Sequence, residues 1–170
     1  TLFRSDAIAN FGSKKNVDLF ERFAVLSSKE VESRMNIMFE SYCKAIAIEG
    51  QSALSIARTM ILPSAQRPQG SVEQSVGAAK AAGVDVKVQE KRLRDFCARI
   101  ETFVVAIDDL TAQFEHAEHH GGAPAEHAKT YRDKVVPAMA KLREIADGLE
   151  TMVDDAEWPL PKYREILFLQ

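Results

Sequence analysis

The sequence predicts an all-α fold: an elongated antiparallel bundle of long helices that ends in an extended tail rich in proline and aromatic residues. Apolar residues recur at three- and four-residue steps over most of the 170 residues. The 8 glycines and 6 prolines are concentrated in a few places between these stretches. The stretch VDVKVQ (84–89) alternates briefly but has no partner strand, so we expect it to lead into a helix.

Composition and charge set limits on the class of protein. Apolar residues make up 46% and charged residues 28%, an ordinary balance for a globular domain. A net charge of −3 leaves no basic surface for nucleic acid or an anionic membrane. No apolar run approaches the ~20 residues of a membrane span, and no secretory signal is visible. We expect a cytoplasmic protein without nucleic-acid or membrane partners.

The first two helices are predicted from their start signals. A short helix begins at Ser13, with Val17, Phe20 and Phe23 on one side. A long helix follows from SSKEVESRM, where Ser27 and Glu30 have the spacing of a capping box. Its apolar positions are Met35, Met38, Phe39, Tyr42, Ile46, Ala53, Leu54, Ala57 and Ile61. Because no proline occurs before residue 63, this helix is expected to extend to about residue 61.

The next stretch contains helix-breaking residues. Pro63, Pro68 and Gly70 are expected to break or kink the pattern. SVEQSVGAAKAAG then predicts a short helix of small residues that ends at Gly83, in the position after the C-cap where glycine is favoured.

Two segments with heptad spacing predict a helical hairpin. The first stripe consists of Leu93, Phe96, Ile100, Phe103, Ile107, Leu110 and Phe114. The second consists of Tyr131, Val135, Ala138, Leu142, Ile145, Leu149 and Met152. HHGGAPAEH joins them, so the two helices should run antiparallel. Pro137 lies inside the second segment and is expected to kink it.

The four histidines gather at the turn of this hairpin and are the candidate metal ligands. They are His116, His119, His120 and His127. On a helix, His116 and His120 would share a face, with Glu115 or Glu118 nearby. A metal-binding bundle would need ligands on the inward stripes, and these have none. A solvated loop explains the cluster, and we assign no metal ligand.

No other group of residues predicts a self-contained active site. The sequence lacks a Ser–His–Asp arrangement and a phosphate-binding glycine loop. Cys43 and Cys97 are expected to be free thiols, half-buried in helices. Asp108 and Asp109 are adjacent rather than spaced for acid–base work. The acidic residues Asp154, Asp155 and Glu157 are expected to be hydrated. We therefore assign no catalytic or cofactor-binding residue.

Four stretches resemble type III glutamine synthetases in the same order. EWPLPKYREILF (157–168) is similar to the C-terminal end of that family. The others are NVDLFERFAVLSSKEVESRMNIMFESYCKAIAIEG, ARTMILPSAQ and YRDKVVPAMAKLREIADGLETMV. Two departures are Ala24, where the family often has glycine, and the AIEG stretch. The resemblance covers nearly the whole chain, and residues 72–128 are the least distinctive.

The resemblance implies a parent enzyme that joins ammonia to glutamate through a γ-glutamyl phosphate, using ATP and Mg²⁺. It also implies longer subunits, arranged as a dodecamer of two stacked rings, with active sites between neighbouring subunits. The family's catalytic and nucleotide-binding residues precede the part that this chain resembles, so none is transferred to it and no cofactor is assigned to this segment. The chain starts at Thr1 without an initiator Met, which is compatible with a fragment.

The resemblance also suggests a division of the chain. Residues 1–62 would be the helical end of the catalytic domain, leading into the bundle. Residues 63–156 would form a C-terminal helical hairpin extension, and residues 157–170 a docked extended tail.

The tail has a physical reason to dock. Pro159 and Pro161 hold their neighbours extended. Trp158, Leu160 and Tyr163 can then lie along a surface. Apolar residues such as those of 166–168 would fray at a terminus unless they were covered. We expect the tail to pack against the bundle, the rest of a ligase or another subunit.

Two functions remain open. The first is a structural and assembly region of a glutamine synthetase, whose partners are the remainder of the ligase chain and neighbouring subunits. The alternative is a stand-alone helical interaction module that binds a partner helix.

Overall fold

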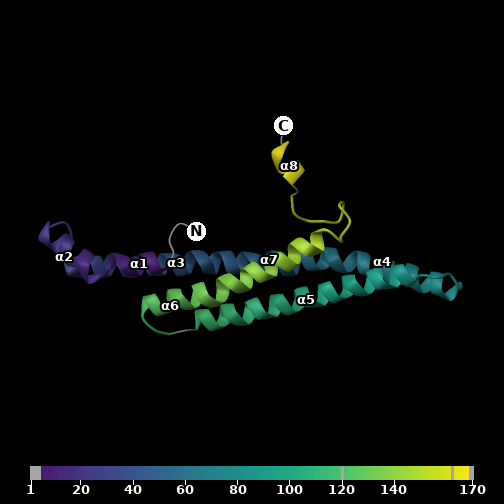
Figure 1. The fold of residues 1–170 in the computed structure, drawn as a ribbon, viewed down its shortest axis with the longest axis horizontal. Coiled ribbons are helices and arrows are strands. Elements are labelled where there is room, and N and C mark those ends of the chain that lie inside the picture. The colour runs from purple at the N-terminus through teal and green to yellow at the C-terminus, as the bar shows by residue number, and fades with distance from the viewer. Residues whose placement is uncertain (1–4, 120, 162, 169–170) are drawn as a thin grey trace. The chain divides into compact units, whose positions relative to one another are not determined.

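The computed structural model describes residues 5–119, 121–161 and 163–168, without the side chains of Tyr163 and Arg164. Every regular element in this part of the chain is a helix, which confirms the all-α fold (Figure 1). The elements are α1 (Ser5–Phe11), α2 (Lys14–Arg22), α3 (Ser28–Ile56), η1 (Ala57–Ile61), α4 (Leu62–Ala81), α5 (Lys87–Glu118), α6 (Pro124–Thr130), η2 (Tyr131–Val135), α7 (Val136–Glu150) and α8 (Tyr163–Leu167). The two elements labelled η are π-helical turns. Among the described residues, no helix combines the length and the apolar character needed to cross a membrane.

The chain forms two compact units. The first contains residues 1–52 and 110–140. Within it, the end of α5 lies antiparallel to α6 and η2, since the Nε2 atom of His127 is 2.8 Å from the carbonyl oxygen of Ala117. The ring of Phe114 meets that of Tyr131 edge-on at 6.4 Å. Its buried apolar side chains are Ile8, Val31, Phe39, Cys43, Ile46, Leu110, Phe114, Ala117, Ala128, Tyr131, Val135 and Ala138.

The second unit contains residues 53–109 and 141–170. Here the side chain of Arg99, on α5, lies over the backbone of α7 at Gly148, where a Cβ atom would meet its guanidinium. The buried apolar residues are Leu54, Ala57, Ile61, Ala65, Val86, Phe96, Ile100, Phe103, Ala106, Ile107, Leu142, Ala146, Leu149, Val153 and Trp158. Both predicted heptad stripes are therefore core, apart from half-buried Leu93 and Ile145 and exposed Met152.

The predicted capping box at the start of α3 is confirmed. The amide of Ser27 donates to Oε2 of Glu30 at 2.8 Å, and the amide of Glu30 donates to Oγ of Ser27 at 3.4 Å. The amide of Ser28 donates to Oε1 of Glu21, which ties the helix start to α2. Ser13 occupies the N-cap position of α2, but its side chain makes no capping hydrogen bond.

Of the break or kink expected at residues 63–70, the break does not occur, because α3, η1 and α4 follow one another without interruption. The amide of Leu62 donates to the carbonyl of Ala57, five residues back, in a widened turn directly before Pro63. A second widened turn precedes Pro137, where the amide of Val136 donates to Tyr131. Proline has no N–H and crowds the carbonyl four residues back, and a wider turn accommodates both effects. The chain therefore stays helical at both Pro63 and Pro137.

The ends of α2 and α4 have the same hydrogen-bonding pattern but different residues in the left-handed position. The amide of Ala24 donates to the carbonyl of Glu21, and the amide of Val25 donates to the carbonyl of Phe20. The φ angle at Ala24 is 50°. After α4 the same two bonds form around Gly83, whose φ is 79°. This is the Schellman motif, in which glycine is favoured because a Cβ atom is strained at positive φ. The predicted role of Gly83 is confirmed.

We expect Ala24→Gly to raise the free energy of unfolding by about 1 kcal/mol, because it removes the Cβ strain at positive φ. The matched change, Gly83→Ala, should lower it by a similar amount. Urea unfolding followed by circular dichroism measures both. A loss of stability in Ala24→Gly would contradict this account of the turn.

A second pair of glycine substitutions tests the packing of the first unit. At Gly50, on α3, a Cβ atom would lie 3.1 Å from the ring of buried Phe114, whereas at Gly77, on α4, it would meet nothing within 4 Å. Gly77→Ala should therefore stabilise the protein by about 1 kcal/mol, the usual gain in an exposed helix. Gly50→Ala should be destabilising, because the ring has to move within a packed core. Equal gains at the two sites in thermal unfolding would argue against tight packing around Phe114.

Candidate interaction surfaces

The three described histidines at the hairpin turn form no metal-binding group with other potential ligands. His116 and His119 are exposed, His127 is half-buried, and His120 lies outside the described residues. The Nδ1 atom of His119 is 2.8 Å from the carbonyl oxygen of Glu115, and the ring of His127 packs 5.1 Å from that of Tyr131. No three potential ligands converge in the described part of the chain. His119 and His127 thus bond to backbone carbonyls of the hairpin.

Neither cysteine has the environment of a nucleophile. Both thiols are free; Cys43 is buried and Cys97 half-buried. Burial raises the pKa of the Cys43 thiol. Burial, followed by the nearby Glu73 carboxylate, raises the pKa of Cys97. A raised thiol pKa lowers the fraction of reactive thiolate.

The acidic residues near the C-terminus support the local structure of the tail. Oδ1 of Asp154 accepts a hydrogen bond from the amide of Ala156 at 2.8 Å, and the carbonyl of Asp154 accepts from Glu157 and Trp158. The carboxylate of Glu157 pairs with Arg67, on α4, at 3.5 Å. On α5, Asp108 is exposed and Asp109 is half-buried.

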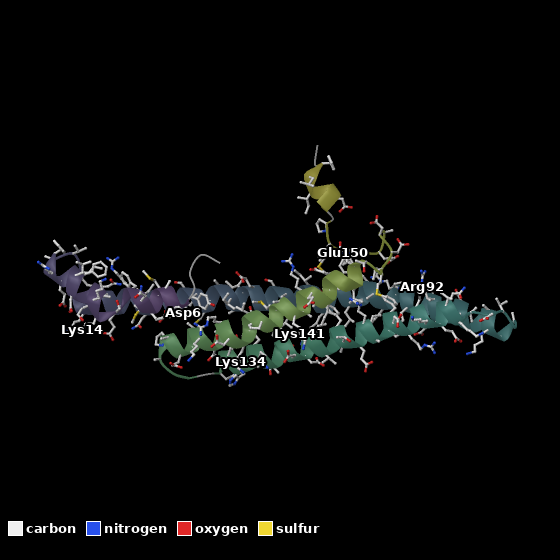
Figure 2. The ribbon with its side chains drawn as sticks, in the orientation of Figure 1. Asp6, Lys14, Arg92, Lys134, Lys141 and Glu150 are labelled. Atoms are coloured by element: carbon white, nitrogen blue, oxygen red, sulfur yellow. The ribbon has the colours of Figure 1, made fainter. Side chains whose placement is uncertain are left out.

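Arg132, on η2, connects the hairpin of the first unit to α1. Its guanidinium pairs with Asp133 at 2.7 Å and with Asp6, and donates to Oγ of buried Ser5 at 3.1 Å (Asp6 is labelled in Figure 2). The hydrogen bond from Arg132 lowers the pKa of the Asp133 carboxyl, and the same pairing raises the pKa of Arg132. This cluster was not predicted from the sequence. Its partners are 126 and 127 positions apart, and no local pattern connects them.

The first candidate surface lies at α2 and the turn after it. One side of α2 is charged and the other apolar, yet none of its residues is buried. The exposed fractions of Leu19, Phe23 and Val25 are 48%, 66% and 63%, and we call these three the α2 surface. A hollow of about 280 Å³ adjoins it, lined by Glu21, Ala24, Val25, Leu26, Ser27 and Glu30. Clustered exposed apolar side chains are typical of a protein–protein contact.

The second candidate surface lies at the end of the tail. Trp158 is buried, and the ion pair of Glu157 holds this part of the tail to α4 within the second unit. Residues 163–167 form the short helix α8 rather than the expected extended chain. The exposed fractions of Ile166, Leu167 and Phe168 are 55%, 71% and 77%. We call these three the tail tip.

The third feature is a groove between α5 and α7 in the second unit. It has a volume of about 550 Å³ and is lined by Asp95, Ala98, Arg99, Thr102, Ile145 and Met152. Lys141 and Glu150 mark the α7 side of this unit in Figure 2. Its lining combines apolar side chains with one cation and one carboxylate. We call it the α5–α7 groove.

Comparison with known proteins finds similarity to glutamine synthetases. Residues 3–80 match the family model of the glutamine synthetase C-terminal domain. The chain is 32% identical to the type-3 glutamine synthetase of Dictyostelium discoideum over 97% of its own length and 23% of the relative's. It is 26% identical to a glutamine synthetase of Bacteroides fragilis, over 85% of its own length and 20% of the relative's. It is 27% identical to that of Butyrivibrio fibrisolvens, over 96% of its own length and 23% of the relative's.

The chain thus spans less than a quarter of the length of these curated relatives. Two of the four stretches that resemble type III glutamine synthetases lie within residues 3–80, which the family model matches. The chain therefore belongs to the type-3 glutamine synthetase family and corresponds to its C-terminal region.

Proposed function

We propose that this chain is the structural and assembly region of a cytoplasmic glutamate–ammonia ligase and supplies no catalytic residue to it. Its partners are the remainder of the ligase chain and neighbouring subunits, in a homo-oligomer that the family resemblance suggests is a dodecamer. ATP and Mg²⁺ bind in the part of the enzyme that this chain does not cover.

The α2 surface is the observation that carries this proposal. A helix with one apolar side normally buries it, because each large apolar side chain contributes about 1.5–3 kcal/mol when fully buried. No residue of α2 is buried in this chain, and Phe23 is 66% exposed. The family match includes this helix, and more than three-quarters of each relative's length lies beyond the matched part. The remaining ligase chain is therefore the proposed cover.

The chemistry of the described residues supports a non-catalytic role. The two thiols have raised pKa values, and His119 and His127 bond to backbone carbonyls. The strongest polar cluster, around Arg132, is satisfied by Asp6, Asp133 and Ser5. Such a cluster positions α1 on the hairpin, and with it the neighbouring α2.

The double substitution Phe23→Ser and Val25→Ser should weaken assembly of the full-length protein by roughly ten-fold or more, because two exposed apolar anchors are lost from the contact. Light scattering during size-exclusion chromatography measures the assembly. Val105→Ser is the matched control, since Val105 is also exposed (58%) but belongs to α5 in the second unit and not to the α2 surface.

The thermal stability of the 170-residue chain separates a lost contact from misfolding. Because Phe23 and Val25 are already exposed, their substitution should leave its unfolding temperature nearly unchanged. Unaltered assembly of the double variant would refute the role of the α2 surface.

Activity distinguishes the ligase from a stand-alone module. We expect the protein purified from its source to be much larger than 18.9 kDa and to form glutamine from glutamate and ammonia with ATP and Mg²⁺. The isolated 170-residue chain should have no such activity. Intact mass spectrometry and a coupled phosphate-release assay measure the two properties. A native chain of this size without activity would support the interaction module instead.

A further inference from the structure

We propose that Arg132 is a positioning residue for assembly: its guanidinium holds α1 on the hairpin, α1 holds α2, and loss of this hold weakens the contact that the α2 surface makes. This inference rests on the proposed function, because it concerns how the same surface is kept in place. It gives a role in assembly to residues that are not part of that surface.

Asp133 orients the guanidinium toward α1. Nε of Arg132 donates to Oδ1 of Asp133 at 2.7 Å, and Nη2 donates to Oδ2 at 3.1 Å. Two parallel hydrogen bonds of this kind fix the plane of a guanidinium. The third nitrogen, Nη1, donates to Oγ of Ser5 at 3.1 Å and pairs with the carboxylate of Asp6. We call these four residues the α1 clamp.

The clamp is prepared before α1 docks. Asp133 directly follows Arg132 in the chain, so the two can pair without any contribution from α1. A side chain that is already oriented loses less conformational entropy when its partner arrives. The clamp therefore favours the docked position of α1.

Apolar burial alone gives α1 and α2 a weak hold on the first unit. Within residues 5–22, Ile8 is the one apolar side chain that is buried. The other buried residue of α1 is Ser5, which belongs to the clamp, and α2 buries no residue. Because hydrogen bonds to a charged group are stronger than those between neutral groups, Arg132 adds substantially to the hold on α1.

α1 and α2 are joined so that they move together. The rings of Phe11 and Phe20 lie 5.5 Å apart across the turn between the two helices. Nδ2 of Asn16 donates to the carbonyl of Asn10 at 2.7 Å, and the amide of Ser13 donates to the same carbonyl at 3.1 Å. A shift of α1 therefore displaces α2 and the surface that α2 carries.

The other end of α2 stays attached without the clamp. The amide of Ser28 donates to Oε1 of Glu21 at 2.9 Å, which ties α2 to the start of α3. Loss of the clamp should therefore reorient α2 and leave the rest of the protein folded. Assembly would weaken because an apolar contact requires two surfaces that fit closely.

A double-mutant cycle on the full-length protein tests this coupling. Arg132→Gln should weaken assembly by about ten-fold, measured by light scattering over a dilution series. In the background of Phe23→Ser and Val25→Ser, the same change should weaken assembly by less than about two-fold, because the surface through which Arg132 acts is already lost. A residue that acts elsewhere in the fold would give additive effects.

Two further variants separate positioning from misfolding and from a general effect of charge. Asp6→Asn changes an exposed side chain and should weaken assembly by about three-fold, with the same non-additivity. Lys80→Gln breaks the ion pair with Glu90 in the second unit and should leave assembly unchanged. Hydrogen exchange of the amides of residues 5–22 should be faster in the Arg132 and Asp6 variants and unchanged in Lys80→Gln.

The outcomes separate this inference from the proposed function. Additive effects in the cycle, unchanged hydrogen exchange at residues 5–22, or an equal loss of assembly in Lys80→Gln would overturn the positioning role and leave the assembly role standing. Full assembly of Arg132→Gln, when Phe23→Ser and Val25→Ser weaken it, would do the same. Unaltered assembly of the Phe23 and Val25 double variant would refute the role of the α2 surface and this inference with it.

Discussion

Burial of one stripe of apolar side chains along α5 is the constraint on which both units depend. Phe103 and Leu110, on this stripe, are fully buried, as is Leu149 on α7. Each such side chain contributes about 1.5–3 kcal/mol when it leaves water. The same stripe fixes the direction of the returning helices, because only an antiparallel return after a short turn brings the second stripe opposite the first in each unit.

The two widened turns show how a long helix tolerates proline. Pro63 and Pro137 each follow a turn in which the preceding amide reaches five residues back. One such turn contains buried Ala57 and Ile61, and the other contains buried Tyr131 and Val135. Core packing holds both helices together where local propensity would end them. The second turn also contains Arg132, whose guanidinium positions α1. The same five residues therefore contain both the widened turn and the side chain that contacts α1.

The distribution of polar and apolar groups is consistent with the assembly role that we propose. Its charged cluster is paired, its thiols are buried or half-buried, and its histidines at 119 and 127 bond to carbonyls. The exposed apolar features include the α2 surface, the tail tip and part of the α5–α7 groove. Natural proteins seldom leave such groups in water without a partner. The proposed assembly role assigns a cover to the α2 surface.

The sequence by itself determined the helical class, the heptad stripes, the capping box of α3 and the glycine at the end of α4, because each depends on spacings within a few residues. It also revealed the family, through ordered motifs. Tertiary structure decided what depends on distant partners. In the tertiary structure, the helix continues past Pro63, Arg132 pairs with Asp6, and the tail tip stays exposed. A proline's local penalty can be offset by burial across the bundle, and an ion pair between residues 126 positions apart leaves no periodic trace in the chain.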